Sequence, residues 1–446
     1  MITRLKTSHP ILDDAKFFSY NSSVSSPMLK PGNEFPNSGR KRPTLLRRLL
    51  KAFGVLATLA AIGAALLLAG LWREHGTAVT LPAPTGRFAT GRATYAWVND
   101  SKTDDLAPTP GVKREVLVWV WYPSSGSPAA TPTDYLPSPW RDALARSSGV
   151  LMSQFFTRDL GMVHTHSSSD PDISLEQRSY PVVLMRAGGG ALTTDFTTLA
   201  EDLASHGYVV VGFDAPYRTG VVVFPDGRVV VRPRTADPEG LGPAEQVRLI
   251  DKLLTMWSGD AQFVVDQLER LNSADPPGRF AGRLDMRRIG VFGHSFGGAT
   301  ALQFCHDDSR CKAGIDIDGA PYGSVVREGL SQPFLFLLSD HGDLSAPDTR
   351  AVFADIESIY DRLPNGRLLL IIGGANHFSF SDQMLVKSRF FITLLQLFRG
   401  GLDGRRGLKI TTAYVHTFFD VYLKNAPASL LDNLRQAYPE VKAGWR

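Results

Sequence analysis

The sequence predicts an α/β fold, a mostly parallel sheet with helices on both faces, preceded by a single transmembrane helix. Two observations indicate this: short apolar runs alternate with helical stretches through the body of the chain, and one long uncharged run lies near its start. Hydrophobic residues make up 43% and charged residues 21% of the 446 residues. This composition excludes a mostly disordered, collagen-like or coiled-coil protein.

The apolar run from Ala52 to Trp72 has no charged side chain. As a helix it would extend about 31 Å, which matches one bilayer core. Basic residues cluster before it, whereas Arg73 after it is followed at once by Glu74, so the positive-inside bias predicts a cytoplasmic N-terminus. A cleaved signal peptide is the alternative, but its apolar region is typically shorter and closer to the start of the chain.

Four segments are therefore expected. They are a disordered basic cytoplasmic tail (1–48), a transmembrane signal-anchor helix (49–72), a spacer (73–93) and a folded catalytic domain (94–446) on the periplasmic or extracellular side. The net charge is +4, but residues 1–51 alone carry an excess of seven positive charges, so the remainder is slightly acidic. No nucleic-acid partner is expected.

Seven apolar runs in the body are typical of buried strands, and several have the continuous apolar character of strands in a parallel sheet. A segment with a central Pro-Asp-Gly, 221–234, is typical of a hairpin. The expected strands are 114–122, 181–185, 208–213, 289–292, 313–317, 334–338 and 368–372, and the helices between them are 195–205, 244–271, 297–305 and 349–363.

The motif Gly293-His294-Ser295-Phe296-Gly297-Gly298 follows the expected strand 289–292 directly and opens a helix. It is the G-x-S-x-G nucleophile turn of α/β-hydrolases, whose flanking glycines let strand and helix approach while the serine points outward. The alternative, a serine that merely caps a helix, leaves the further glycine unexplained. Ser295 is thus the predicted nucleophile.

A serine nucleophile needs a histidine base held by an acid, and in α/β-hydrolases both follow the serine. Among the downstream histidines, His377 follows the last apolar strand, where a loop would present an imidazole at the carboxyl edge of the sheet. For the acid, Asp318 and either Asp340 or Asp343 qualify by position, and the residues alone do not choose between them. Asp316 is the weakest candidate, because it lies within a strand. The other histidines lie in a charged loop, a loop rich in Ser, Asp and Gly, and a helical segment: His306, His341 and His416.

An oxyanion hole needs backbone amides, one of them from the residue after the nucleophile, Phe296. The second is expected from the loop after strand 181–185, which contains a triple glycine at 188–190. The alternative for this loop is a flexible turn. No metal or organic cofactor is expected.

Two further groups of residues, a pair of histidines and a pair of cysteines, could bind a metal or form a disulfide. His164, His166 and Asp170 could bind a metal, but they lie in an expected Ser-rich loop without a further clear ligand and are interpreted as surface residues. The two cysteines, Cys305 and Cys311, are close enough in sequence for a disulfide on the non-cytoplasmic side, but two separate thiols are the alternative.

With these residues identified, the chain resembles the platelet-activating factor acetylhydrolase family, which are calcium-independent serine phospholipases. The resemblance covers roughly 114–423, and it is closest in four segments: 180–183 (YPVV), 203–210 (LASHGYVV), 293–300 (GHSFGGAT) and 314–318 (GIDID). It implies that Asp318 is the acid and that the amide of Gly189 joins that of Phe296. One departure is that this chain has Ala187-Gly188 where the family usually has His-Gly.

The sequence therefore predicts a membrane-anchored serine ester hydrolase that cleaves lipid-like or short-acyl esters, including phospholipids. Ser295, His377 and Asp318 would form the triad. The alternatives are a non-catalytic envelope binding protein with this fold, and an acyltransferase or peptidase that uses the same triad. The acyl length, the choice between hydrolysis and transfer, and the oligomeric state are left open by the sequence.

Overall fold

The computed structural model describes residues 44–126, 131–273, 278–342, 346–399 and 401–444. The chain divides into two compact units, residues 1–62 and 63–446, and each is described by itself. In the first unit the described residues belong to helix α1 (Leu45–His75), which continues into the second unit. This helix is long and apolar enough to cross a membrane, a property it shares with signal sequences. It begins at Leu45, a few residues before the expected anchor, and most of the expected tail lies outside the described residues.

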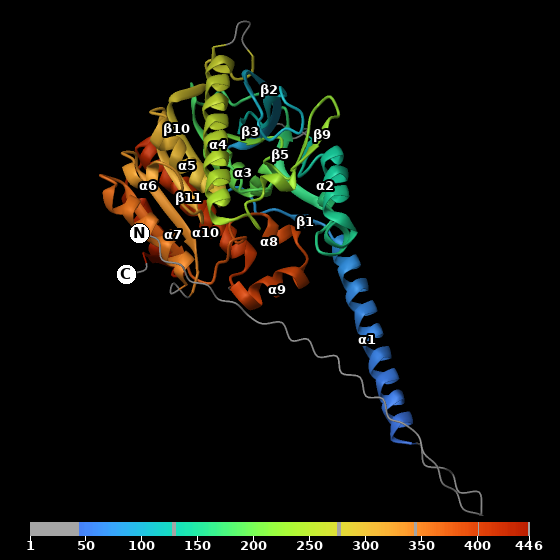
Figure 1. Cartoon of the computed structure of the whole chain (residues 1–446). Coiled ribbons are helices and arrows are strands. Elements are labelled where there is room, and N and C mark those ends of the chain that lie inside the picture. Colours follow the sequence, from blue (N-terminus) through green and yellow to red (C-terminus); the bar gives the residue numbers. More distant parts are fainter. Residues whose placement is uncertain (1–43, 127–130, 274–277, 343–345, 400, 445–446) are drawn as a thin grey trace, which may run out of the picture. The chain divides into compact units, whose positions relative to one another are not determined.

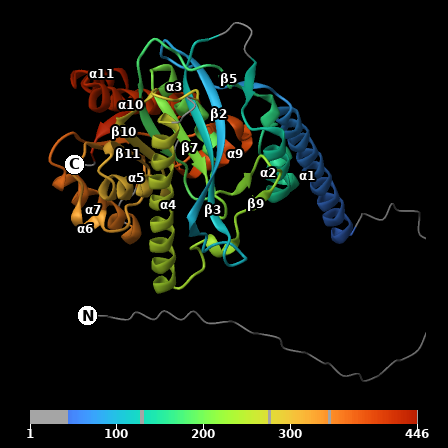
Figure 2. The same cartoon turned by 90° about the horizontal axis from the view of Figure 1, so that it is seen from above.

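A sheet of twelve strands forms the centre of the second unit in the part of the chain that the structure describes (Figures 1 and 2). Its order is β1-β5-β2-β3-β7-β6-β10-β11-β12-β13-β14, with β4 paired to β5. The strands are β1 (Val79–Thr80), β2 (Ala89–Thr103), β3 (Lys113–Ser124), β4 (Pro132–Asp134), β5 (Val163–Ser169), β6 (Tyr180–Arg186), β7 (Val209–Asp214), β10 (Leu284–His294), β11 (Cys311–Ile317), β12 (Phe334–Ser339), β13 (Arg367–Ile372) and β14 (Val441–Ala443).

The six strands β7, β6, β10, β11, β12 and β13 are parallel to their neighbours, so their carboxyl ends share one edge of the sheet. The strands β3 and β14, which flank this parallel block, are antiparallel to it. Buried, β-branched and aromatic residues dominate these strands, as expected for strands covered on both faces. The carboxyl edge of the parallel block is where ligands bind in α/β sheets.

Helices cover both faces of the sheet, and each face has its own core cluster. One cluster includes side chains of α3 and α10, and the other includes side chains of α4, α5 and α7. The helices are α2 (Ser138–Val150), α3 (Thr197–Ser205), α4 (Pro243–Asn272), α5 (Phe296–Asp307), α6 (Val325–Glu328), α7 (Pro347–Arg362), α8 (Gln383–Val386), α9 (Arg389–Arg399), α10 (Gly404–Lys424) and α11 (Ser429–Ala437). The expected α/β-hydrolase architecture is confirmed.

The seven expected strands correspond to β3, β6, β7, β10, β11, β12 and β13, and the expected hairpin is the pair β8 (Val221–Val223) and β9 (Val229–Val231). The expected spacer differs, because it contains β1 and the start of β2. Two of its apolar residues, Leu81 and Phe88, are buried in the two core clusters. The Thr- and Pro-rich composition of this segment predicted a spacer, because its contacts in the core are with residues distant in sequence.

The Ser-rich segment with His164 and His166 is also not a loop, since it forms strand β5. His164 is exposed there, whereas the ring of His166 bonds the carbonyl of Leu81 at 3.0 Å. Short polar side chains concealed the alternation of this strand, in which Val163, Thr165 and Ser167 point inward. On α5 and the start of β11, the two cysteines form a disulfide, which the sequence had left open.

Candidate active site

The loop between β10 and α5 holds Ser295 in a conformation that few residues adopt. Its φ is 57° and its ψ is −126°, a strained geometry for a residue with a side chain. The flanking glycines explain how the turn closes: a Cβ at Gly293 would collide with the backbone of Gly297, and one at Gly297 with that of Arg186. The chain can make this sharp turn only because both positions lack a side chain.

The loop after β13 places His377 beside the end of β11, where Asp318 lies. Its Nδ1 is 2.7 Å from Asp318 Oδ2. The Asp318 side chain is fully buried, and the backbone amide and hydroxyl of Ser339 donate to its two oxygens at 2.8 and 2.9 Å. The structure therefore joins an imidazole to a fixed carboxylate near the serine turn. Within the described residues no hydrogen bond joins the Ser295 hydroxyl to His377.

A second histidine contacts the same acid. His341, in the loop after β12, lies with Nε2 at 3.1 Å from Asp318 Oδ1. Burial alone would raise the pKa of Asp318, but the hydrogen bonds from His341 and His377 and their charges hold it well below its usual range. His341 was not among the residues expected at the site, because it lies in a loop rich in Ser, Asp and Gly. Its position directly after a buried parallel strand was the available signal.

The other acid candidates lie elsewhere. Asp340 is exposed and accepts hydrogen bonds from backbone amides of Gly342 and Gly374, and Asp343 lies outside the described residues. Asp316 is buried and accepts the amide of Gly319 at 2.9 Å, and burial raises its pKa well above the usual value. Asp316 has a structural hydrogen bond, as its place within a strand predicted.

The motif histidine, His294, supports the loop that carries His377. Its Nε2 is 2.7 Å from the carbonyl of His377, and the two ring centroids are 4.4 Å apart. Burial and the neighbouring His377 lower the pKa of His294 to about 3, so its ring is neutral at physiological pH. A neutral ring with one N–H suits the donation to a carbonyl that this position requires.

Two backbone amides lie beside the serine turn. Phe296 is the first residue of α5, so its N–H has no acceptor within the helix. Gly189 lies in the loop after β6, and its amide has no backbone acceptor among the hydrogen bonds of the described residues. Both residues line one cavity together with Ser295.

Arg186, the last residue of β6, stands just before the glycine loop, and its buried side chain contacts β7 and α4. Its guanidinium donates to the carbonyl of Phe213 at 2.9 Å and lies 3.8 Å from the ring centroid of Trp257. Ala187, which stands where the family usually has histidine, is fully buried. The residue before this departure from the family is thus a buried cation packed on the rings of Phe213 and Trp257.

The cavity beside Ser295 has a volume of about 410 Å³. Helix α4 contributes an apolar wall, and the segment after β9 contributes polar side chains that include the ion pair of Arg232 and Asp237. A larger hollow of about 1010 Å³, between β2 and α4, includes none of the predicted site residues. The smaller cavity is lined by Gly189, Arg218, Arg232, Ala236, Asp237, Pro238, Glu239, Ile250, Leu253, Trp257, Ser295, Phe296 and Tyr322.

The chain is similar in sequence to known esterases. The family model described as platelet-activating factor acetylhydrolase, isoform II, matches residues 244–433. A probable 1-alkyl-2-acetylglycerophosphocholine esterase of Arthroderma benhamiae is 26% identical over 60% of this chain and 66% of its own length. The platelet-activating factor acetylhydrolase of Cavia porcellus is 25% identical over 55% of this chain and 58% of its own length. The chain thus matches less than two thirds of the length of these relatives.

A solved structure covers more of the chain. The ferulic acid esterase from Streptomyces cinnamoneus is 28% identical, covers 82% of this chain and 98% of its own, and has a TM-score of 0.66. The chain has the α/β-hydrolase fold, and the proteins to which it is similar are carboxylic ester hydrolases. Among these it is similar in sequence to the platelet-activating factor acetylhydrolases, so the resemblance found in the sequence is confirmed.

Proposed function

We propose that the chain hydrolyses carboxylic esters through a covalent acyl-enzyme on Ser295. The observation that carries this proposal is the convergence, at one edge of the sheet, of a serine on a strained turn and a histidine bonded to a buried carboxylate. A serine hydroxyl is a weak nucleophile near neutral pH and requires a base of this kind.

In the first half of the reaction, Ser295 Oγ attacks the ester carbonyl carbon while His377 Nε2 takes the hydroxyl proton. Asp318 accepts the Nδ1–H of His377 and stabilises the imidazolium that forms. The amides of Gly189 and Phe296 donate to the oxyanion. The tetrahedral intermediate then expels the alcohol, which takes the proton from His377, and leaves the acyl group on Ser295.

In the second half, His377 removes a proton from water, which attacks the acyl carbonyl. Collapse of the second tetrahedral intermediate breaks the bond to Ser295 and returns the proton to its oxygen. The free structure lacks the hydrogen bond between Ser295 and His377. Such bonds are often long in free enzymes and tighten when substrate binds.

For the substrate we propose lipid-like esters with a short acyl group. The names of the relatives include acetylated ether phospholipids, and the cavity combines an aromatic and aliphatic wall with charged side chains. In the aromatic wall, Phe296 lies edge-on to Trp257 with centroids 4.9 Å apart. Such a wall suits a small acyl group or the start of an alkyl chain, and the charged side is suited to a polar headgroup.

We further propose that residues 49–72 anchor the enzyme as a single-pass helix, with the N-terminus cytoplasmic and the catalytic domain outside. Support comes from the uncharged run of this helix and the basic cluster before it. Within the second unit, Glu74 at the end of α1 pairs with Arg158 at 2.8 Å. N-terminal sequencing of the mature protein tests this, because loss of residues up to the end of α1 would mean a cleaved signal peptide.

The function is tested by labelling the full chain in detergent with a fluorophosphonate, followed by hydrolysis of esters of graded acyl length. We expect one label per chain, lost in Ser295→Ala and retained in Ser147→Ala, a matched control at an exposed serine on α2. A folded wild-type chain that takes no label would instead support a non-catalytic binding protein. Products formed in the presence of competing alcohols separate hydrolysis from acyl transfer.

A further inference from the structure

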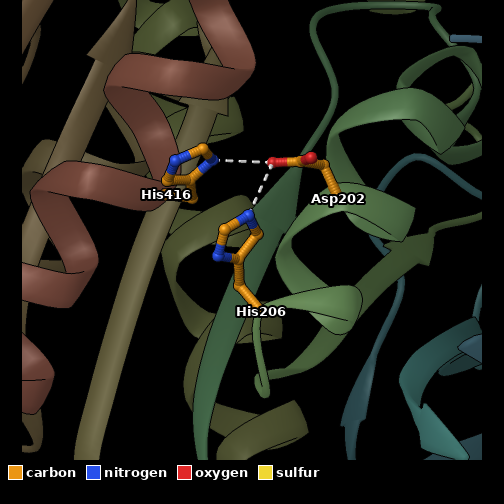
Figure 3. A group of neighbouring side chains, drawn as sticks. All are labelled: Asp202, His206 and His416. Atoms are coloured by element: carbon orange, nitrogen blue, oxygen red, sulfur yellow. Dashed lines mark hydrogen bonds and ion pairs between the residues drawn. The ribbon is translucent and has the colours of Figure 1, made fainter. Parts of the chain in front are cut away.

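A second group of histidines and an aspartate lies at the opposite edge of the sheet from Ser295. Helix α3 connects β6 to β7, which are parallel, so its last turn lies at the amino edge of the sheet. Asp202 is in that turn, His206 caps the helix, and His416 reaches the same place from α10. Figure 3 shows the three side chains pointing toward one another.

The atoms of this group converge on one point. His416 Nδ1 lies 2.8 Å and His206 Nε2 lies 4.0 Å from Asp202 Oδ2, and the potential ligand atoms all lie within 4.8 Å of one another. A tetrahedral zinc ion with bonds of about 2.0–2.2 Å holds its ligand atoms roughly 3.3 Å apart. Small side-chain rotations would therefore bring all three atoms to bonding distance.

Neighbouring groups already orient the carboxylate. The backbone amide and the hydroxyl of Thr85 donate to Asp202 Oδ1 at 2.9 and 2.7 Å, so Oδ2 is directed toward the histidines. Outer hydrogen bonds of this kind fix ligand orientation in metal sites. The nearest ammonium, on Lys424, is held by the carboxylate of Asp420 at 3.0 Å and by the carbonyl of His206.

Each imidazole already has one hydrogen-bond partner, which a bound ion would replace. His416 is bonded to Asp202, and the Thr85 hydroxyl lies 2.9 Å from His206 Nε2. The ring of His206 also stacks on the ring of His416, with centroids 4.0 Å apart. The Asp202 side chain is 4% exposed and the two rings are 22% and 17% exposed, so the carboxylate is buried while solvent reaches the imidazoles. An ion can therefore enter without unfolding the helix.

We propose that Asp202, His206 and His416 bind a divalent transition-metal ion of the zinc type and thereby fasten α10 to the end of α3. Two imidazole nitrogens and one carboxylate suit Zn²⁺, whereas Ca²⁺ takes six or more oxygens. Each neutral ring would bind through the nitrogen facing Asp202 and carry its proton on the other nitrogen. Water would complete the coordination. The site is independent of the ester chemistry proposed above.

The experiment uses the full chain in detergent, without a polyhistidine tag and after treatment with a chelator. Zn²⁺ is titrated by calorimetry, and Co²⁺ is added in parallel so that visible absorption reports nitrogen and oxygen ligation. The variants are His206→Gln and His416→Gln, and the control is His164→Gln, an exposed histidine on β5. We expect one ion per wild-type chain, a higher Tm with Zn²⁺, and affinity at least about tenfold weaker in both ligand variants.

The control should bind as the wild type does. The proposal is overturned if the wild-type chain binds no ion, or if either ligand variant keeps wild-type affinity while folded. Should His416→Gln fail to fold because Asp202 loses its partner, His206→Gln decides alone. Its ring is more exposed, and Co²⁺ absorption retained in this variant contradicts the site, whereas absorption lost supports it.

Discussion

Two aspartates of this chain each lie beside two histidines, and the two groups lie at opposite edges of the sheet. Asp318 ends strand β11 and contacts His377 and His341, whereas Asp202 lies in the last turn of α3 and contacts His416, with His206 4.0 Å away. In both groups a ring nitrogen lies within 2.8 Å of a carboxylate oxygen. The same residue types therefore do not by themselves define a catalytic site.

The difference between the two groups is what surrounds the carboxylate. Asp318 is fixed by Ser339 at a strand end, and His377 contacts His294 of the nucleophile turn, whose Ser295 lines a cavity. Asp202 is fixed by Thr85, and its histidines face solvent from two helices. Residues at the ends of parallel strands lie along one edge of the sheet, which is where ligands bind in α/β folds. Residues on two packed helices instead meet at the contact between those helices.

The largest expected effect distinguishes the two acids. We expect Asp318→Asn to lower kcat by about 10⁴, because the amide no longer holds His377 in the tautomer that accepts the serine proton. Asp202→Asn should leave the kcat of the folded chain unchanged. Steady-state hydrolysis of a short-acyl ester, with the folded fraction taken from circular dichroism, makes the measurement, and equal losses in the two variants would refute the assignment of the acid.

A second effect concerns stability and pH at the catalytic edge. The pKa of His294 is about 3 when folded, against about 6.5 when unfolded, so between these values the unfolded state binds more protons. Within this range, His294 makes the free energy of unfolding rise by about 1.4 kcal/mol per pH unit. This contribution of His294 to stability is fully present above about pH 6.5 and is lost as the pH falls toward 3.

We expect His294→Gln to remove this contribution to the slope. Urea unfolding between about pH 4 and pH 6 measures it, since these values lie between the folded and the unfolded pKa of His294. His164→Gln, at an exposed histidine, should keep the wild-type slope. An identical slope in His294→Gln would mean that this ring is not held neutral by burial.

A third effect tests the additional histidine on the acid. His341→Ala should lower kcat about tenfold, or about 1.4 kcal/mol, with KM unchanged, because Asp318 loses one of the hydrogen bonds that orient it. His341→Gln retains an N–H donor and should recover most of the loss. A rise in KM without a change in kcat would instead indicate that His341 contacts substrate.

The smallest effect concerns the support of Asp202. Thr85→Val removes one hydroxyl donor and should lower the free energy of unfolding by about 1 kcal/mol while ester hydrolysis is unchanged. Urea unfolding and kcat measured on the same preparation provide the comparison. A loss of turnover in this variant would connect the two edges of the sheet, which the structure gives no reason to expect.

Much of the fold follows from local sequence patterns. The seven buried strands and the nucleophile turn were predictable because continuous apolar runs and glycines at fixed spacing are properties of short segments. Strands β1 and β5 were not, because Thr, Ser and His give them a polar composition. Their place in the sheet depends on pairing between Val79 and Val163, which no local pattern records.

The sequence by itself determined the α/β class, the serine turn at Ser295 and the base candidate His377, because each depends on neighbours along the chain. The tertiary structure decided which acid lies beside His377, brought His341 onto that acid, and joined His416 to Asp202. These contacts link residues from different loops and helices. The distances between these residues depend on how the strands and helices pack, so the hydrogen bonds and ion pairs form only when the chain folds.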